Sequence, residues 1–381
     1  MKRKILYITG TRADFGLMTT VLKKIDSHPH FSLRIIATGM HLMDEFGQTI
    51  QEIQDAGFSV CRIDATIDDD KSSATVSFIG NFMRQLAEEL DADRPDLILV
   101  LGDRGEMLAG AIAGSYMNIP VAHIHGGEIS STVDDITRHA ITKFAHIHLS
   151  ATKESADRIL RMGEDPSRIF VVGAPGLDQV LSDDPVSPEI LAGRYMINPD
   201  RPLILVLQHP VSLESDHAAD QIKDTLDAVL DTGEQAIIIY PNSDAGGREM
   251  IQIIRSYQAN KSFRVVKNIP HNEFLGLLRI SSVLVGNSSS GIIEAPSFGI
   301  PVVNVGTRQW GRERAQNVID CGYSKDQISA ALRKALTDTI FLAQVRMCRN
   351  PYGDGKSADK IIKILSEIPI DTSLLQKRMT Y

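Results

Sequence analysis

The sequence has few cysteines and no long apolar run. Its three cysteines, Cys61, Cys321 and Cys348, are far apart and form no CxxC or Cys/His spacing, so we expect neither a structural zinc site nor a disulfide framework. No stretch approaches 18 apolar residues, which excludes a membrane-spanning helix on length alone. The charged N-terminus is not followed by the apolar run of a signal peptide, so we expect a cytoplasmic protein.

Basic residues are not in excess. Lys plus Arg is 40 and Asp plus Glu is 48, a formal charge of −8, so we expect no general affinity for nucleic acid or anionic membranes. A local basic pocket for a phosphorylated small molecule is still compatible with this charge. Hydrophobic residues make up 43% and charged residues 23%, as in an average globular protein. A length of 381 residues suggests two or three domains.

Several cofactor and catalytic motifs are also missing. There is no P-loop GxxxxGK[ST], no Gly-x-Ser-x-Gly nucleophile elbow and no HExxH, which argues against an NTPase, an α/β-hydrolase and a metal site. The loop Gly10–Gly16 is not GxGxxG, and no acidic residue ends the strand predicted at Leu33–Thr38 in the way that NAD sites need. We therefore expect no metal and no cofactor.

Short β-branched runs alternate with amphipathic segments along the whole chain. The runs are apolar throughout, as expected of parallel strands that are covered on both faces. Segments such as Leu17–Ile25, Ile79–Leu90 and Gln221–Leu230 have the spacing of amphipathic helices. The alternation predicts an α/β fold with doubly wound sheets. The predicted strands are Ile5–Thr9, Leu33–Thr38, Leu97–Leu101, Pro120–Ile124, His146–Ser150, Ile169–Val172, Leu203–Leu207, Ala236–Tyr240, Arg264–Val266, Val283–Val285 and Val302–Val305.

The region from Pro175 to Pro202 interrupts this alternation. It is rich in proline and glycine and has few strand signals, so we place the domain boundary there, with domains at residues 1–176 and 177–355. Two Rossmann-like doubly wound domains joined by one linker predict a cleft between the carboxyl ends of their strands. Open α/β sheets bind ligands at that edge.

Polar residues gather directly after the predicted strands of the first domain. Arg12 follows the first strand beside a helix N-terminus, which suits an anion, although an ordinary turn with a solvated arginine is equally compatible. After later strands, Asp103, Glu128 and Asp134 could converge with His125. Asp134 could instead be only a helix N-cap, and Glu128 only a solvated loop residue.

The second domain shows the same arrangement. His209 follows its first strand, the loop 240–246 with Asn242 and Asp244 follows its second, and the glycine- and serine-rich loop Gly286–Gly291 follows a later one. Such a loop at the start of a helix can cradle phosphates, because small residues allow close approach and hydroxyl and N–H groups donate. Glu294 is placed to accept from sugar hydroxyls. Together with His209 and Arg308, this loop predicts a diphosphate site.

Taken together, these motifs resemble the hydrolysing UDP-N-acetylglucosamine 2-epimerases, which make N-acetylmannosamine for sialic acid synthesis. The resemblance runs from about Lys4 to the segment Asn350–Tyr352. It implies a glycosyltransferase-B-like architecture, in which a C-terminal helix at about 356–381 crosses back to the first domain, and a homo-oligomer (dimer or tetramer). The motifs that carry the resemblance are Gly10–Asp14, Gly102–Arg104, His123–Glu128, Arg138–Lys143 and Gly286–Gly291.

The resemblance implies conversion of UDP-N-acetylglucosamine and water to N-acetylmannosamine and UDP, by anti elimination to a glycal and then hydration. A carboxylate base, Glu128 or Asp134, would take the C2 proton while positive groups stabilise the leaving diphosphate. Many family members have a glutamate where this chain has His125, so the role of that position stays open. The candidate catalytic residues are Asp103, Glu128, Asp134, His125 and His209. The candidate substrate-binding residues are Arg12, Arg104, Asn242, Asp244, Ser288, Ser289, Ser290, Gly291, Glu294 and Arg308.

Three alternatives are compatible with the same residues. The first is the same reaction on another nucleotide sugar, such as a UDP-2,4-diacetamido-trideoxyhexose or GDP-N-acetylglucosamine, for legionaminic-type acid synthesis. The second is a glycosyltransferase-B enzyme, which would need an acceptor. The third is a nucleotide-sugar-binding protein without turnover. The acidic residues after the N-terminal strands argue against the third, because binding a dianionic ligand does not require them.

Overall fold

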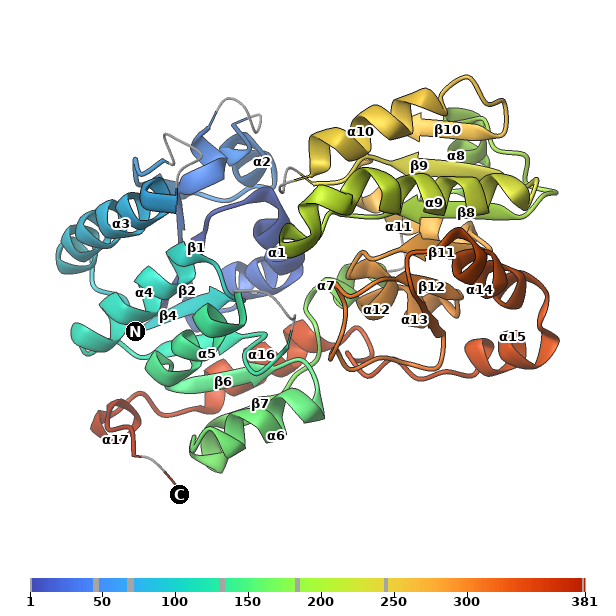
Figure 1. Cartoon of the computed structure of the whole chain (residues 1–381). Coiled ribbons are helices and arrows are strands. Elements are labelled where there is room, and N and C mark those ends of the chain that lie inside the picture. Colours follow the sequence, from blue (N-terminus) through green and yellow to red (C-terminus); the bar gives the residue numbers. More distant parts are fainter. Residues whose placement is uncertain are drawn as a thin grey trace. The chain divides into compact units, whose positions relative to one another are not determined.

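The chain folds into two compact α/β units. One unit comprises Met1–Gln179 and Tyr352–Tyr381, and the other comprises Val180–Pro351. The computed structural model describes residues 2–43, 48–66, 72–129, 134–181, 186–242, 246–378 and 380. Each unit is built on one parallel β-sheet with helices on both of its faces (Figure 1). The predicted fold class, with two doubly wound sheets, is confirmed.

The sheet of the first unit has the order β3-β2-β1-β4-β5-β6-β7, and all its strands are parallel. Its strands are β1 Arg3–Thr9, β2 Phe31–Ala37, β3 Val60–Arg62, β4 Leu97–Leu101, β5 Val121–Ile124, β6 Ile147–Ser150 and β7 Ile169–Val171. Its helices are α1 Arg12–Ser27, α2 Ile50–Asp55, α3 Ser72–Ala92, α4 Gly105–Tyr116, α5 Asp134–Phe144, α6 Lys153–Arg161, α16 Ser357–Glu367 and α17 Thr372–Leu375, with α7 Gly176–Val180 at the boundary and 3-10 turns at Gly39–Leu42 and Pro166–Arg168.

The second sheet repeats this plan with the order β10-β9-β8-β11-β12-β13, again all parallel. Its strands are β8 Leu203–Leu207, β9 Gln235–Ile239, β10 Phe263–Val266, β11 Val283–Gly286, β12 Val302–Val305 and β13 Val318–Cys321. Its helices are α8 Pro188–Tyr195, α9 Ala218–Asp231, α10 Gly247–Ser256, α11 His271–Ile280, α12 Ser290–Ile293, α13 Ala295–Phe298, α14 Lys325–Thr337 and α15 Thr339–Arg346, with a 3-10 segment at Ser212–His217.

All eleven predicted strands are present, and two further strands were missed. The missed strands are β3 and β13, which pair at the sheet edges with β2 and β12. They are short and only partly buried, so they lack the continuous apolar run by which buried parallel strands are recognised.

The C-terminal helix α16 belongs to the first unit, as Figure 1 shows. It packs against α1, and Ala358, Ile361 and Leu365 are fully buried in the same core cluster as Met18. The carboxylate of Asp178 accepts hydrogen bonds from the backbone N–H groups of residues 357 and 358, at 2.8 and 2.6 Å. These two bonds satisfy N–H groups that the first turn of a helix leaves without partners.

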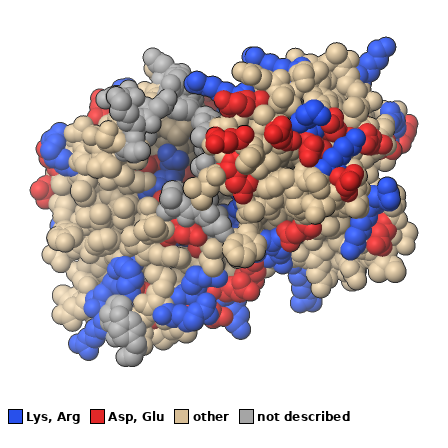
Figure 2. All heavy atoms as spheres, in the orientation of Figure 1, with Lys and Arg blue, Asp and Glu red and all other residues tan. Residues whose placement is uncertain are grey.

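Charged side chains of both signs are interspersed over the face drawn in Figure 2. The described residues on that face form no broad basic patch of the kind that nucleic-acid binding requires. Among the helices that the structure describes, none is long and apolar enough to cross a membrane.

Candidate active site

Two loops at the carboxyl ends of β4 and β5 carry Asp103 and Glu128, two of the three acidic residues predicted in the first unit. Gly102 has a φ of +77° and turns the chain directly after β4, before Asp103. Gly127 also has a φ of +77°, and a Cβ atom there would lie 2.3 Å from the carbonyl oxygen of Ser155. Only glycine fits that position, and the turn it makes leads directly to Glu128.

Arg138, on α5, connects these two loops. Its guanidinium forms an ion pair with Asp103, contacts Asp135 at 2.5 Å and donates to the backbone carbonyl oxygen of Glu128 at 3.0 Å. Arg138 is only 3% exposed, and a buried guanidinium needs such partners to offset its lost hydration. The sequence had not singled out Arg138 as a site residue, although its motif was one of those that carried the resemblance.

His125 and Glu128 form a hydrogen-bonded pair between imidazole Nδ1 and carboxylate Oε1. Glu128 is 6% exposed, so it is not the solvated loop residue that was one of its two interpretations. His125 has a φ of +61°, a left-handed conformation that residues other than glycine adopt rarely and that often marks functional sites. Asp134 is the first residue of α5, but its side chain lies outside the described part of the structure.

The two arginines predicted to bind substrate each pair with a carboxylate. Arg12 begins α1 and pairs with Glu52 at 3.0 Å, with about half of each side chain exposed. Arg104 precedes α4, and its Nε donates to the buried carboxylate of Glu106 at 2.6 Å.

In the second unit, His209 is tied to two neighbouring loops. Its backbone N–H donates to the Asn287 side chain at 2.7 Å, and the Asn287 amide donates back to the His209 carbonyl oxygen at 2.8 Å. Nδ1 of His209 accepts from the backbone N–H of Asn242 at 3.0 Å. Burial, with a smaller effect from Arg308, lowers the pKa of His209 to about 3. The imidazole is therefore neutral at physiological pH, and because Nδ1 is the acceptor, Nε2 carries the proton.

The serine-rich loop begins at Gly286, whose φ is +128°. A Cβ atom there would lie 2.2 Å from the carbonyl oxygen of Leu207. Arg308 donates to the carbonyl oxygen of Asn287 at 3.1 Å, and the amide of Gln309 donates to the same atom at 2.8 Å. The guanidinium is thus attached to the loop that was predicted to cradle a diphosphate.

The structure therefore groups the predicted residues of each unit separately. In the second unit, Asn287 organises the site, although it was predicted only as a member of the motif. Asp244 lies outside the described residues. In the first unit, Asp103, His125 and Glu128 lie around Arg138, and Arg12 and Arg104 each form a separate ion pair. In the second unit, Glu294 lies at the end of α12. The other predicted residues of the second unit are His209, Asn242, Ser288, Ser289, Ser290, Gly291 and Arg308.

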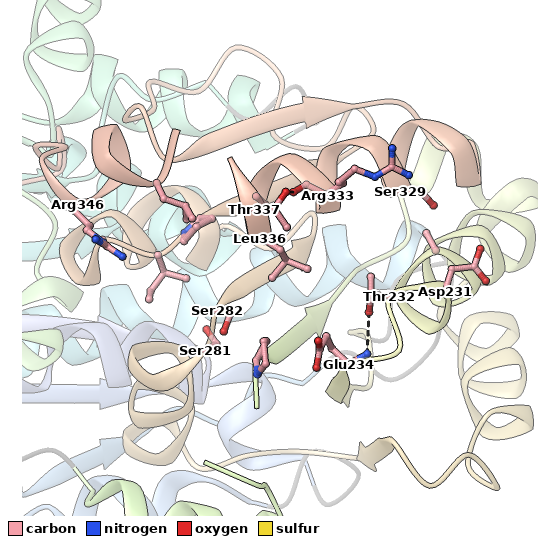
Figure 3. Close-up of a pocket in the computed structure, with 17 residues that line it drawn as sticks. Asp231, Thr232, Glu234, Ser281, Ser282, Ser329, Arg333, Leu336, Thr337 and Arg346 are labelled. Atoms are coloured by element: carbon pink, nitrogen blue, oxygen red, sulfur yellow. Dashed lines mark hydrogen bonds between the residues drawn. The ribbon is translucent and has the colours of Figure 1, made fainter. Parts of the chain in front are cut away.

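A pocket of about 650 Å³ lies elsewhere in the second unit (Figure 3). Pro202, Ser282 and Pro301 line it, and each directly precedes a strand, so the pocket lies at the amino ends of β8, β11 and β12. None of the predicted site residues lines it. Within the described ranges, no cluster of three or more His, Cys, Asp or Glu side chains could hold a metal ion.

Comparisons with known proteins agree on one family. Residues 23–366 match the family model described as UDP-N-acetylglucosamine 2-epimerase. The chain is 43% identical, over the whole of both chains, to the UDP-N,N'-diacetylbacillosamine 2-epimerase (hydrolyzing) of Legionella pneumophila. It is 36% identical to the UDP-N-acetylglucosamine 2-epimerase of Neisseria meningitidis serogroup B, over 87% of each chain.

Solved structures show the same fold. The crystal structure of UDP-GlcNAc 2-epimerase from Neisseria meningitidis bound to UDP-GlcNAc has a TM-score of 0.81 and 19% identity, and covers 96% of this chain and 100% of that one. The Methanocaldococcus jannaschii UDP-GlcNAc 2-epimerase in complex with UDP-GlcNAc and UDP has a TM-score of 0.77 and 20% identity, over 95% and 99% of the chains.

We expect folding stability to fall as the pH drops below about 6.5, because four histidines are held neutral in the fold. Burial lowers the pKa of His123 and His209 to about 3, and of His41 and His146 to about 4. The unfolded chain binds protons on these groups below about pH 6.5 and the folded chain does not, so their stabilisation is complete above that pH and is lost below it. Two carboxyl groups oppose this effect, because burial raises the pKa of Asp14 to about 6 and also raises that of Asp178.

The measurement is the midpoint of thermal unfolding between pH 7.5 and pH 4.5. His146→Gln should make the unfolding midpoint depend less steeply on pH. Each histidine of this kind changes the free energy of unfolding by up to about 1.4 kcal/mol per pH unit. His30→Gln is the control, since His30 is exposed. A midpoint that is independent of pH, or equal slopes in the two variants, would contradict the prediction.

Proposed function

The chain belongs to the UDP-N-acetylglucosamine 2-epimerase family, and we propose from this premise that it is a hydrolysing 2-epimerase. It releases UDP and a free 2-acetamido sugar whose configuration at C2 is inverted. The observation that carries the proposal is the 43% identity, over both complete chains, to a relative that is named as hydrolysing. A Campylobacter jejuni relative that is 33% identical over 84% of each chain also bears that word in its name.

We propose UDP-N,N'-diacetylbacillosamine as the substrate. The Legionella relative named for this sugar matches the whole chain at 43%, whereas the Neisseria relative named for UDP-N-acetylglucosamine matches 87% of it at 36%. UDP-N-acetylglucosamine, the substrate expected from the sequence, becomes the second candidate. The two sugars share the C2 acetamido group and the UDP leaving group, so the same chemistry serves both.

The reaction begins with loss of UDP from C1. The C1–O bond breaks, its electron pair leaves with UDP, and the oxocarbenium character at C1 makes the C2 proton removable. A base then takes that proton, and the C–H electron pair forms the C1=C2 bond of a glycal. Water next adds at C1 while a proton returns to C2 on the opposite face, so atoms and charges balance.

We assign the proton transfer at C2 to Glu128, with Asp134 as the alternative base. The hydrogen bond from His125 orients the Glu128 carboxylate, as a base near a reacting carbon requires. Arg138 forms an ion pair with Asp103 and fixes the position of its carboxylate. The Asp103 carboxylate would stabilise positive charge that develops on the sugar.

We assign the diphosphate to groups of the second unit. His209 carries its proton on Nε2, and Arg308 is anchored to the serine-rich loop. These donors, together with the hydroxyl groups of Ser288–Ser290, would stabilise the charge that accumulates on the leaving UDP. Glu294 and Asn242 remain candidates for contacts to the nucleoside, as Arg12 and Arg104 do for anionic parts of the substrate.

Turnover in D₂O tests the reaction. With UDP-N,N'-diacetylbacillosamine we expect UDP and the free C2-inverted sugar, with one deuterium at C2, because elimination and rehydration exchange that proton with solvent. Proton NMR identifies the products, and kcat/KM for UDP-N-acetylglucosamine, measured in parallel, decides between the two substrates. A sugar still attached to UDP, or a product without deuterium at C2, would refute the mechanism. Turnover only with an added acceptor would identify a glycosyltransferase.

Replacing the acidic residues should slow the chemical step. Glu128→Gln and Asp103→Asn should each lower kcat by about 100-fold or more and change KM by only a few-fold, because these groups act on charge that develops in the transition state. Glu154→Gln, at an exposed position in the first turn of α6, is the matched control. Steady-state kinetics provides the measurement, and losses confined to KM would reassign both residues to substrate binding.

Replacing Arg308 should weaken nucleotide binding itself. Arg308→Ala removes a charge-assisted donor from the proposed diphosphate site, so the affinity for UDP alone should fall by about 2 kcal/mol, or roughly 30-fold. Arg333→Ala is the control, since Arg333 lines the pocket at the other edge of the sheet. Titration calorimetry with UDP measures both, and equal affinities in the two variants would remove Arg308 from the site.

A further inference from the structure

The order of strands in the first sheet reverses between β1 and β4. The chain runs outward from β1 to β2 and β3, and then returns to β4 on the other side of β1. The loops after β1 and β4 therefore lead to helices on opposite faces, and such a switch point is where doubly wound sheets bind ligands. Arg12, the first residue of α1, follows the loop after β1, and Arg104 lies at the end of the loop after β4.

Glu106, in the first turn of α4, contacts both loops. Its carboxylate accepts from Nε of Arg104 at 2.6 Å. A Cβ atom built on Gly10 would lie 1.8 Å from Oε1 of Glu106, so the carboxylate lies directly against the Gly10 backbone. Glu106 is only 1% exposed, whereas 40% of the Arg104 side chain is exposed. A buried anion thus holds a cation that remains accessible to a ligand.

Asp14 fixes the loop after β1 independently. Its carboxylate accepts from the backbone N–H of Gly10 at 3.1 Å and of Thr11 at 2.9 Å, and it completes the capping box of α1. Burial raises the pKa of Asp14 to about 6, and the negative charge of Glu106 adds to that rise.

A second buried carboxylate beside Asp14 is electrostatically costly. An apolar side chain in such a place is often as stabilising as a buried ion pair, or more so. Packing alone therefore does not account for a glutamate at position 106. A role in positioning the Arg104 guanidinium does account for this glutamate.

We propose that Glu106 is a positioning residue for the 2-epimerase reaction. It orients the Arg104 guanidinium, so this arginine is in place before the anionic substrate arrives. Substrate binding then does not have to order the Arg104 side chain, and this preorganisation raises affinity. The inference rests on the proposed function, because that function supplies the anionic ligand.

The test is steady-state kinetics on Glu106→Ala, Arg104→Ala and the double variant, with whichever UDP-sugar the wild type converts. Glu106→Ala should raise KM by about tenfold, as expected for the loss of one charge-assisted contact, with a smaller change in kcat. If Glu106 acts through Arg104, the double variant should match Arg104→Ala within about twofold. An unchanged KM in Glu106→Ala, or losses that multiply in the double variant, would overturn the proposal.

Glu106→Gln is a second variant that tests the proposal if Glu106→Ala does not fold. It preserves the shape and can still accept from Arg104, so its KM should lie between those of the wild type and Glu106→Ala. A Glu106→Gln variant with a KM as high as that of Glu106→Ala would also count against the proposal. Glu88→Ala is the control, because Glu88 forms an exposed pair with Arg84 on α3 and its removal should leave KM unchanged.

Failure of the proposed function is distinguishable from failure of this inference. If the wild type converts neither UDP-sugar, the proposed function is wrong. Calorimetry with UDP alone then tests Glu106. A Kd for UDP that rises about tenfold in both Glu106→Ala and Arg104→Ala supports the positioning role, and an unchanged Kd in both overturns it.

Discussion

Parallel sheets that are covered on both faces confine the chemistry of this protein to the ends of its strands. The central strands β1, β4, β5, β8 and β11 are almost completely buried, and a charged side chain within them would have no water and few partners. The charged residues of both candidate sites therefore lie where the chain leaves the sheet, whereas the polar side chains within the strands, such as His123 and His148, are buried and uncharged. Because every strand in a unit runs in the same direction, the loops that follow them gather at one edge.

At that edge of the first unit, a buried arginine determines the arrangement of the carboxylates. Arg138 is 3% exposed and needs negative partners, which Asp103 and Asp135 supply. The carbonyl oxygen of Glu128 takes a further donor of the guanidinium. One side chain on α5 thus fixes the loops after β4 and β5 together, and the Glu128 carboxylate is left to pair with His125.

The second unit reaches a similar result with an amide in place of a buried cation. Asn287 exchanges two hydrogen bonds with the backbone of His209, and its carbonyl oxygen accepts from Arg308 and Gln309. The Asn287 amide adds no charge to the loop, and burial keeps His209 neutral by lowering its pKa to about 3. Neutral donors beside the Arg308 guanidinium are the groups that the proposed diphosphate site would use.

The amino-acid sequence by itself determined the fold class, the eleven strong strands and the loops in which polar residues gather, because apolar runs and glycine turns are local signals. It did not reveal β3 and β13, which are defined by pairing with β2 and β12 rather than by their own composition. Nor did it reveal that the Glu128 carboxylate is buried and hydrogen-bonded to His125, or that the Glu106 carboxylate lies against the backbone of Gly10. Arg138 and Asn287 stood within recognised motifs, yet their partners are far away in sequence, and only the tertiary structure brings Asp103 to Arg138 and His209 to Asn287. Burial and pairing of charged and polar groups depend on which distant segments pack together, and no local pattern encodes that.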